Sequence, residues 1–376
     1  MTARAATSPF SARMAGLRAA MTERGTDAVL LSVGAELPWL CGYEAMPLER
    51  LTMLVVPVDD DPTLFVPRLE APRVREQDGL FRIRPWDETE DPLRLVAQAV
   101  GPARSLAIGD RTWSRFTVGL VGLVDGARFS NASELCGPLR AVKDGHEVEV
   151  LHRAGAAVDR IAAALQAGEI PLVGRTEAQV SAELGQRILA EGHHRVNFAI
   201  VAAGSNAASP HHEPGDRVIE AGEVVLCDFG GTMADEWGVG YCSDITRCVW
   251  TGEAPAEAVE VYSVVRAAHA AAVAAARPGA TGKEVDLAAR RVVVAAGLGD
   301  HFVHRTGHGI GVEEHEDPYI VEGNDVPLVD GNCFSIEPGV YLPGRFGFRL
   351  EDCVAANGSG VAPFTDIDHD LVSVDA

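Results

Sequence analysis

Apolar and polar positions in the first third of the chain predict short strands that alternate with helices. Apolar residues at 14–21 recur at helical spacing, and Gly25 is placed to end that helix. A second helix is expected at 93–100. Four short apolar runs predict buried strands: 28–32, 51–57, 63–67 and 105–109. The pattern indicates a small α/β domain, in which Trp39 and Trp86 are interpreted as packing or rim residues rather than catalytic ones.

The pattern changes at 137–149, a segment that mixes glycine, proline and charge and then opens a long helix. We therefore predict two domains, 1–138 and 139–376. In the second, Thr176 followed by Gln179 is a capping-box signal for another helix. Two apolar strands are expected after it, at 197–203 and 223–231.

The same order of elements then recurs along the chain. Alanine-rich helices are expected at 258–275 and 282–296, and strands at 333–340 and 347–355. Two helices followed by strands, twice over, indicate a pseudo-duplicated domain whose site lies between the halves.

Composition narrows the classes of function. The chain of 376 residues is 47% hydrophobic, which is ordinary for a globular protein and enough for two domains. Acidic side chains outnumber Lys plus Arg by 54 to 32, and the formal charge of −22 disfavours nucleic acid and anionic membranes as partners. We expect no membrane span, because the apolar runs fall short of the roughly 20 residues required. Seven cysteines without a CxxC pair favour a reducing cytoplasm.

Five residues suited to metal binding are spread over the last two-fifths of the chain: Asp228, Asp244, His308, Glu337 and Glu351. The four carboxylates lie in short apolar runs, where burying an unpaired charge costs several kcal/mol. A pair of divalent metal ions about 3.5–4 Å apart compensates such burial, and forms a centre for metal-assisted hydrolysis.

The sequence around these five residues supports them as metal ligands, and leaves cysteine ligation as one alternative. Asp228 and Asp244 are placed to lie on neighbouring strands, and glycines flank His308. Cys242 shares a strand face with Asp244, and Cys353 with Glu351, so thiolate ligation is the alternative and would favour zinc. We prefer buried packing for both cysteines.

Five sequence blocks carry a family resemblance: HHEPGDRVIEAGEVVLCDFGG, YCSDITR, HRTGHGIGVEEHEDP, FSIEPGVY and GFRLEDC. Over about residues 140–376 they resemble the pita-bread metallopeptidases (M24B), in the Xaa-Pro dipeptidase and aminopeptidase P branch. RMAGLRAAMTERGTDAVLLS and LPWLCGYE resemble the creatinase/prolidase N-terminal domain more loosely. The resemblance implies an α/β (α+β) chain: a creatinase/prolidase-type N-terminal α/β domain, then a pseudo-duplicated pita-bread catalytic domain.

Position by position, the resemblance places the family's metal ligands on the same five residues and adds four site residues: His211, His304, His315 and Arg349. It implies that Glu337 moves a proton from water to the leaving nitrogen. His304 and His315 would donate to the oxyanion or position the substrate, and His211, which stands beside His212, would do likewise. Arg349 would pair with a substrate carboxylate or hold a metal-binding carboxylate, and both options stay open.

The resemblance also implies cofactors, substrates and assembly. Two divalent ions per subunit are expected, with Mn²⁺ or Co²⁺ favoured and Zn²⁺ as a further candidate. The implied reaction is hydrolysis of the bond before proline by a metal-bridged hydroxide, chiefly in Xaa-Pro dipeptides. Alternatives are aminopeptidase P acting on longer Xaa-Pro peptides, a member recruited to a non-peptide substrate, and a silent binding module. A cytoplasmic homodimer is expected, with the N-terminal domain of one subunit bordering the site of the other.

One segment departs from the family pattern. The stretch 231–241, between the two aspartates, is longer than in many members of this branch. We expect a longer hairpin loop that leaves the ligands in place and reshapes the pocket entrance. Asp235 and Glu236 are interpreted as solvated loop acids.

Overall fold

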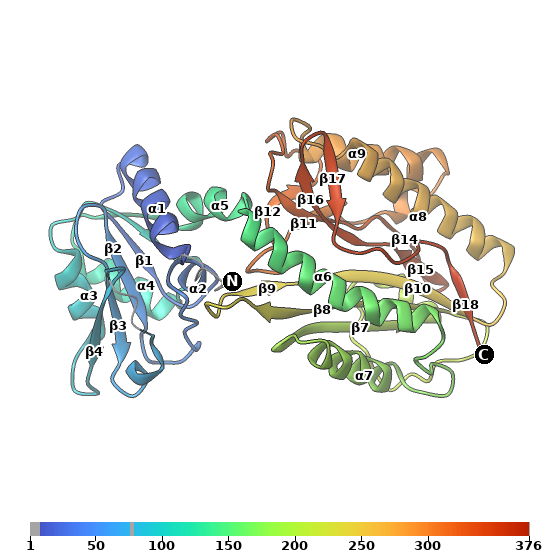
Figure 1. Ribbon diagram of the computed structural model, residues 1–376, viewed down its shortest axis with the longest axis horizontal. Coiled ribbons are helices and arrows are strands. Elements are labelled where there is room, and N and C mark those ends of the chain that lie inside the picture. The colour runs from blue at the N-terminus through green and yellow to red at the C-terminus, as the bar shows by residue number, and fades with distance from the viewer. Residues whose placement is uncertain (1–7, 76–78, 376) are drawn as a thin grey trace, which may run out of the picture. The chain divides into compact units, whose positions relative to one another are not determined.

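The structure, a computed structural model, describes residues 8–75 and 79–375 (Figure 1). These residues form two compact units. The first runs to Arg140 and also takes in Asp235–Val239, and the second holds Ala141–Ala234 and the chain from Gly240 onward. The mixed α/β class expected from the sequence is confirmed.

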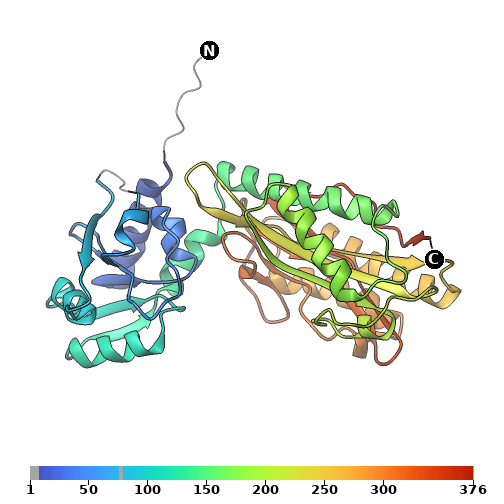
Figure 2. The same cartoon turned by 90° about the horizontal axis from the view of Figure 1, so that it is seen from below.

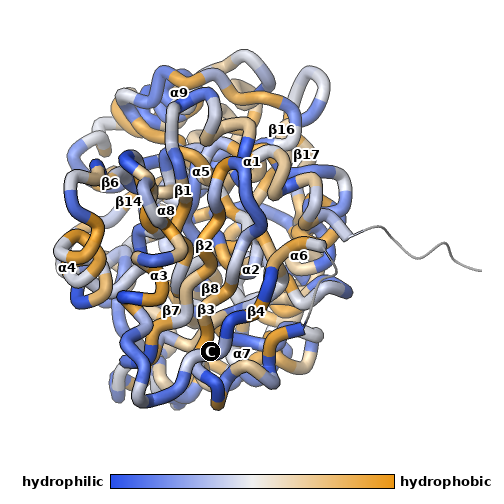
Figure 3. The backbone as a smooth tube through the Cα atoms, turned by 90° about the vertical axis from the view of Figure 1, so that its left-hand side faces the viewer, coloured by the Kyte–Doolittle hydropathy of each residue, from blue (hydrophilic) through white to orange (hydrophobic). Residues whose placement is uncertain are grey.

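The first unit is built on one six-stranded sheet with the strand order β4-β3-β2-β1-β5-β6. Its elements are α1 (Phe10–Arg24), β1 (Ala28–Leu31), α2 (Glu36–Cys41), β2 (Met53–Pro57), β3 (Thr63–Pro67), η1 (Ala71–Arg73), β4 (Arg82–Trp86), α3 (Pro92–Val100), β5 (Ser105–Ile108), α4 (Ser114–Leu123), β6 (Arg128–Asn131) and α5 (Ser133–Ala141). Hydrophobic residues run along β2 and β3, as their colour in Figure 3 shows, and are buried. Trp39 and Trp86 are buried too, which confirms their interpretation as packing residues.

The second unit repeats a pair of helices followed by a mainly antiparallel sheet. Its helices are α6 (Gly145–Gln166), α7 (Glu177–Ala190), α8 (Ala256–Ala275) and α9 (Gly282–Ala295), with short turns η2 (Gly204–Ala208) and η3 (Gly299–His301). Its strands are β7 (Arg195–Ala203), β8 (Val224–Ala234), β9 (Gly240–Cys242), β10 (Ile245–Thr251), β11 (Gly307–Gly309), β12 (Glu316–Ile320), β13 (Cys333–Ile336), β14 (Gly339–Leu342), β15 (Phe346–Arg349), β16 (Asp352–Asn357), β17 (Gly360–Pro363) and β18 (Val372–Val374). Helices α6, α7 and α9 each begin with a capping box, so both halves use the same local start signal.

Two sheets carry the site. One has the strand order β18-β10-β8-β7, with β9 paired to β8, and the other has the order β12-β11-β13-β16-β17. In Figure 2 the green helices α6 and α7 lie over one face of the yellow-green strands of the first sheet. Strand β8 is buried on both faces: Val225 and Cys227 pack with α6 and α7, whereas Val224 and Leu226 join the core that contains α8. Burial on both faces explains the unbroken apolar run. Asp228 lies on the same face as Leu226.

No helix long and apolar enough to span a membrane was expected from the sequence, but α8 meets that criterion. With 20 residues it is long and apolar enough, by length and composition alone, to cross a membrane. In this structure 39% of its apolar stretch is buried, and one face packs into the core: Val265, Ala268 and Ala272 are fully buried in the cluster of α8, α9 and their sheet.

The long segment between the two aspartates is mostly strand. Strand β8 continues to Ala234, and Met233 pairs with Tyr241 of β9. The interpretation of Asp235 as a solvated acid is wrong: it is buried, and its Oδ1 accepts hydrogen bonds from the backbone N–H groups of Trp237 (2.9 Å) and Val239 (2.8 Å). This carboxylate shapes the turn itself, as aspartates in Asx turns do. Glu236 is exposed.

Candidate metal centre and active site

The five sequence-predicted ligands come from five places in the second unit and line one cavity of about 470 Å³. Asp228 lies on β8, and Asp244 lies between β9 and β10. His308 is on β11, Glu337 follows β13, and Glu351 lies between β15 and β16. Both halves of the pseudo-duplicated unit therefore supply ligand-type side chains.

Strand pairing explains how such distant residues meet. On β10, Thr246 lies opposite Asp228 of β8, and on its other side it forms an isolated bridge with Glu351. The hydroxyl of Thr246 donates to Oε2 of Glu351 at 2.7 Å. On β13, Oγ of Ser335 accepts from the backbone N–H of His308 at 3.1 Å. Strand pairing alone, without a metal ion, thus positions two or more of the candidate ligands in each sheet.

The ligand oxygens and nitrogen lie close together. Nε2 of His308 is 3.3 Å from Oε1 of Glu337 and 3.8 Å from Oδ2 of Asp244. Donor atoms of Asp244, His308 and Glu351 all lie within 4.8 Å of one another. Among the described residues of this cluster, three buried carboxylate oxygens have no hydrogen-bond partner: Oδ1 of Asp228, Oδ1 of Asp244 and Oε1 of Glu351. Such orphaned oxygens are costly unless a cation lies between them.

Burial and the repulsion between neighbouring carboxylates raise the pKa values of several carboxyl groups in this cluster. Burial, followed by the charge of neighbouring carboxylates, raises the pKa values of Asp244 and Glu351 well above their usual range. Burial also raises the pKa of Glu337 to about 7. A divalent cation would reverse these shifts, because it stabilises the ionised form.

His308, a candidate ligand, is a neutral imidazole in this environment. Burial, with the nearby His315, lowers the pKa of His308 to about 3. Its Nδ1 lies 3.1 Å from the carbonyl oxygen of Gly309, so the proton is assigned to Nδ1 and the lone pair of Nε2 faces the carboxylates. One neutral imidazole among four carboxylates fits a divalent metal ion.

Arg349 contacts the carboxylate cluster directly. Its Nη2 donates to Oδ2 of Asp228 at 2.5 Å, and its Nε donates to the Thr246 hydroxyl at 3.1 Å. Its Nη1 donates to the hydroxyl of Tyr341 at 2.8 Å and to the carbonyl of Pro210 at 3.2 Å. In this geometry Arg349 holds a carboxylate of the centre in place, which is one of the two options that the sequence left open.

Both ring nitrogens of His304 are engaged. Nδ1 lies 2.7 Å from the carbonyl oxygen of Arg305, and Nε2 lies 2.9 Å from the Tyr341 hydroxyl. Burial, followed by the charge of Arg349, lowers the pKa of His304 to about 3, so the ring is neutral. With its proton on Nδ1, His304 accepts a hydrogen bond from Tyr341 and has no second N–H for an oxyanion.

His315 has the opposite arrangement. Its Nδ1 accepts from Nη2 of Arg305 at 3.0 Å, which leaves the proton of the neutral ring on Nε2. Burial lowers the pKa of His315, and Arg305 adds to that shift. Its ring centroid lies 3.8 Å from that of His308. Its N–H is therefore available beside the ligand cluster.

The adjacent histidines are separated by their contacts. His211 lines the cavity, whereas Nε2 of His212 lies 2.8 Å from Oε2 of Glu177 and 3.2 Å from Nδ2 of Asn206. The structure therefore places His211, rather than His212, in the cavity that the five candidate ligands line.

Sequence reasoning missed several residues of the cavity. Besides the nine predicted positions, five more line it: Phe198, Ile200, Pro210, Arg305 and Glu314. Ile200 of β7 lies opposite Asp228 of β8. Once that pairing is known, side-chain alternation along β7 places Phe198 and Ile200 on one face of the strand. Tyr341 is a further missed residue, because its contacts with His304 and Arg349 depend on tertiary packing.

The cysteines fit the packing interpretation. Burial raises the pKa of Cys242 to about 12 and that of Cys353 well above its usual range, so both thiols stay protonated. Cys353 donates to the carbonyl of Asp244 at 3.6 Å, and Cys242 to that of Val312 at 3.7 Å. Because both thiols donate to backbone carbonyls, we interpret them as packing residues rather than as thiolate ligands.

Three buried carboxylates, the half-buried carboxylate of Glu337 and a neutral imidazole, gathered between two helix and sheet halves, define a class: a metal-dependent hydrolase. The chain matches Metallopeptidase family M24 over residues 149–357 and the Creatinase/Prolidase N-terminal domain over residues 13–142, and it belongs to this metallopeptidase family. The family resemblance and the expected fold class are confirmed, and the chain is a metallopeptidase of a family that uses divalent metal ions.

Relatives and solved structures agree over nearly the whole chain. A "Probable dipeptidase PepE" of Mycobacterium tuberculosis is 40% identical over 97% of this chain and 96% of its own length. An "Xaa-Pro dipeptidase" of Lactobacillus helveticus is 36% identical over 93% of this chain and 96% of its own. The crystal structure of a recombinant prolidase from Thermococcus sibiricus superposes with a TM-score of 0.92 at 32% identity, covering 98% of this chain and 100% of that one.

Proposed function

We propose that this chain hydrolyses the peptide bond before proline, chiefly in Xaa-Pro dipeptides, with two divalent metal ions as cofactors. The names of its relatives support the substrate class. The observation that carries the proposal is the cluster of buried carboxylates, with orphaned oxygens, around Nε2 of His308.

Five residues would hold the two ions: Asp228, Asp244, His308, Glu337 and Glu351. When bound, such ions supply a hydroxide near neutral pH and polarise the scissile carbonyl. Oxygen-rich ligation with one nitrogen supports Mn²⁺ or Co²⁺, with Zn²⁺ as a further candidate.

Glu337 is proposed to carry the proton to the leaving nitrogen. Its side chain is 15% exposed, against 3% for that of His308, so it faces the substrate space more than its neighbour does. The hydroxyl of Ser335 donates to its Oε1 at 3.3 Å, which fixes the direction of the carboxylate. A carboxylate held between the ligand cluster and the substrate is placed to accept and release a proton.

The histidines and Arg349 are proposed to orient the reaction. His315, with its proton on Nε2, donates to the oxyanion, and Arg305 keeps that tautomer in place. His304 and His211 line the cavity and position the substrate. Arg349 acts as a positioning residue through its bond to Asp228.

Arg305 supports a dipeptidase over an aminopeptidase. It lines the same cavity as the five ligands and places a cation there. A dipeptide ending in proline carries a free carboxylate next to the scissile bond, and a guanidinium recognises such a group well. An aminopeptidase substrate has an amide at this position, so Arg305 would lose its charged partner.

The test compares Ala-Pro with Ala-Pro-Gly-Gly after removal of metal and addition of Mn²⁺ or Co²⁺. The proposal expects metal-dependent cleavage with Ala-Pro strongly preferred. Preferred cleavage of the tetrapeptide would favour aminopeptidase P. No cleavage of any Xaa-Pro peptide, with or without added metal, would favour either a silent binding module or a recruited enzyme acting on a non-peptide substrate.

Three broader features are also proposed. The chain is divided into a creatinase/prolidase-type domain, 1–138, and a catalytic domain, 139–376, supported by the ranges of the two family matches. A cytoplasmic location is supported by the seven cysteines, which all lie in the described ranges and are all free. A homodimer is supported by the family resemblance, and light scattering at the monomer mass would contradict it.

A further inference from the structure

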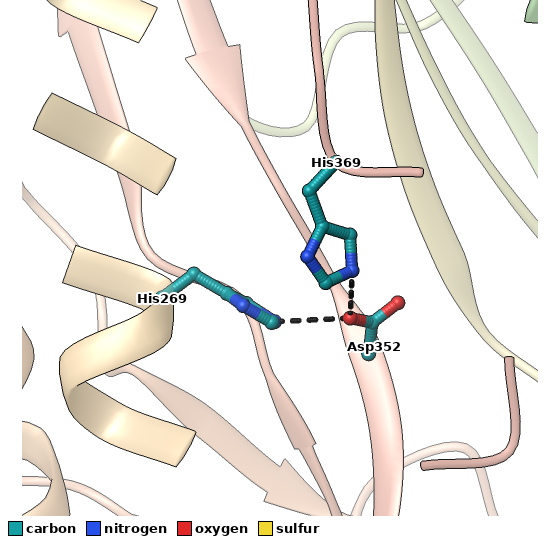
Figure 4. A group of neighbouring side chains, drawn as sticks. All are labelled: His269, Asp352 and His369. Atoms are coloured by element: carbon teal, nitrogen blue, oxygen red, sulfur yellow. Dashed lines mark ion pairs between the residues drawn. The ribbon is translucent and has the colours of Figure 1, made fainter. Parts of the chain in front are cut away.

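A second cluster of ligand-type side chains lies in the C-terminal half of the second unit (Figure 4). His269 comes from α8, Asp352 begins β16, and His369 precedes β18. Their donor atoms lie within 4.8 Å of one another. Oδ2 of Asp352 is 3.2 Å from Nε2 of His269 and 2.7 Å from Nε2 of His369. Two imidazoles from different elements thus point at one carboxylate oxygen.

The carboxylate of Asp352 is fixed from its other side. Its Oδ1 accepts from Nη2 of Arg247 at 2.7 Å and from the hydroxyl of Thr365 at 2.8 Å. These bonds orient the group and leave Oδ2 toward the two histidines. Partners of this kind, which hold a carboxylate in one direction, are the usual support of a metal ligand.

His269 provides an independent sign of a missing partner. Its side chain is 3% exposed, and within the described part of the chain its Nε2 has no well-aligned hydrogen-bond partner, since its 3.2 Å approach to Oδ2 of Asp352 has poor hydrogen-bond geometry. A buried ring nitrogen without a partner is unfavourable. A cation between the three groups would accept the lone pairs of both imidazoles and of Oδ2.

We propose that His269, Asp352 and His369 form an auxiliary site for a divalent transition-metal ion, separate from the catalytic centre. Two nitrogens and one oxygen suit Zn²⁺, Ni²⁺, Co²⁺ or Cu²⁺, whereas Mg²⁺ and Ca²⁺ prefer oxygen ligands alone. Ligands about 2.0–2.2 Å from such an ion lie roughly 2.9–3.5 Å apart. The observed separations of 2.7 and 3.2 Å are close to that range.

Access and charge set the strength of the site. The side chain of His369 is 38% exposed, so an ion can enter from solvent, while the other two ligands form a buried base. The guanidinium of Arg247 on the same carboxylate opposes a second cation. The catalytic centre has four carboxylates, so we expect the auxiliary site to fill after it.

A bound ion would join three elements: α8, β16 and the segment that precedes β18. The hydroxyl of Tyr262 on α8 already donates to the carbonyl of His369 at 3.0 Å. Coordination by His269 and Asp352 would add a metal-mediated link to the hydrogen bonds that already hold the C-terminal segment, such as that from Thr365 to Asp352. Amide hydrogen exchange in residues 364–371 should therefore slow when the ion binds.

The test is equilibrium dialysis of the full chain against Ni²⁺, with bound metal measured by elemental analysis. The variant His369→Gln removes one ligand on a partly exposed segment, and His301→Gln, a partly exposed histidine on η3, is the matched control. We expect wild type and control to retain one equivalent of Ni²⁺ more than His369→Gln. Mg²⁺ should give no such difference.

Two further measurements separate this site from the catalytic one. In proteins that also carry Asp244→Asn, the difference in bound Ni²⁺ between His369 and His369→Gln should persist. Ni²⁺ should protect residues 364–371 from hydrogen exchange only when His369 is present. If His369→Gln misfolds by circular dichroism, His369→Asn takes its place. Equal Ni²⁺ stoichiometry in wild type and a folded position-369 variant, or an equal loss in the His301→Gln control, would overturn the proposal.

Discussion

Thr246 is the residue whose replacement tests most sharply how strand pairing builds the centre. It is fully buried on β10, donates to Glu351 at 2.7 Å and accepts from Nε of Arg349 at 3.1 Å. Thr246→Val keeps the shape of the side chain and removes both bonds. Because hydrogen bonds to charged groups contribute about 1.5–3 kcal/mol, and supporting partners of ligands about 10–100-fold in affinity or activity, we expect kcat and metal affinity to fall by roughly 10–100-fold.

The assay has a control on the same strand. Thr251 is also fully buried on β10, and its hydroxyl donates to the carbonyl of Glu220 at 2.8 Å, at a distance from the ligands along the strand. Activity is measured against free Mn²⁺ concentration, and thermal unfolding is measured with and without metal. Thr251→Val should lose stability alone, whereas Thr246→Ser should recover most of the metal affinity.

Two results would refute the reasoning about Thr246. Thr246→Val with the metal affinity and kcat of the wild type, and only a lower Tm, would show that the hydroxyl merely stabilises the fold. Equal loss of metal affinity in Thr251→Val would show that any buried defect in β10 has the same effect.

Three further predictions concern the same centre. His308→Ala should abolish turnover while circular dichroism stays native, because one ligand is lost; activity at full metal occupancy would contradict it. Arg305→Gln should raise KM for Ala-Pro and leave that for Ala-Pro-amide nearly unchanged, since only the former offers a carboxylate; equal changes would remove the assigned role. Burial raises the pKa of Glu337 from 4.5 to about 7, so the folded metal-free chain binds the extra proton. The contribution of Glu337 to stability is present below pH 4.5 and is lost as pH rises through about 7, so the Tm of the metal-free protein should fall across this window. The fall should be smaller in Glu337→Gln. An identical fall in that variant would show that Glu337 is not its cause.

Much of the ligand set was predictable because burial of charge is so unfavourable. Asp228, Asp244, Glu337 and Glu351 stand in apolar runs that would otherwise reject them, and the structure brings all four to one cavity with His308. The repeat of two helices and a sheet was visible for a similar reason, since both halves must bury an apolar face.

The remaining features depend on contacts between distant strands and could not be read locally. Thr246 and Tyr341 became important only when β8, β10 and β15 were placed together. The two engaged nitrogens of His304 likewise follow from Tyr341 and from a backbone carbonyl. Asp235 appeared to be a solvated acid, because sequence shows neither its turn bonds nor its burial.

The most direct test of the metal centre is anomalous diffraction from crystals loaded with Mn²⁺, Co²⁺ or Zn²⁺, combined with elemental analysis of the same protein. We expect two anomalous peaks among the side chains of Asp228, Asp244, His308, Glu337 and Glu351, and two equivalents of metal bound at this centre. Absence of anomalous density between these five residues in fully loaded protein would contradict the central claim that they form a dinuclear hydrolytic centre.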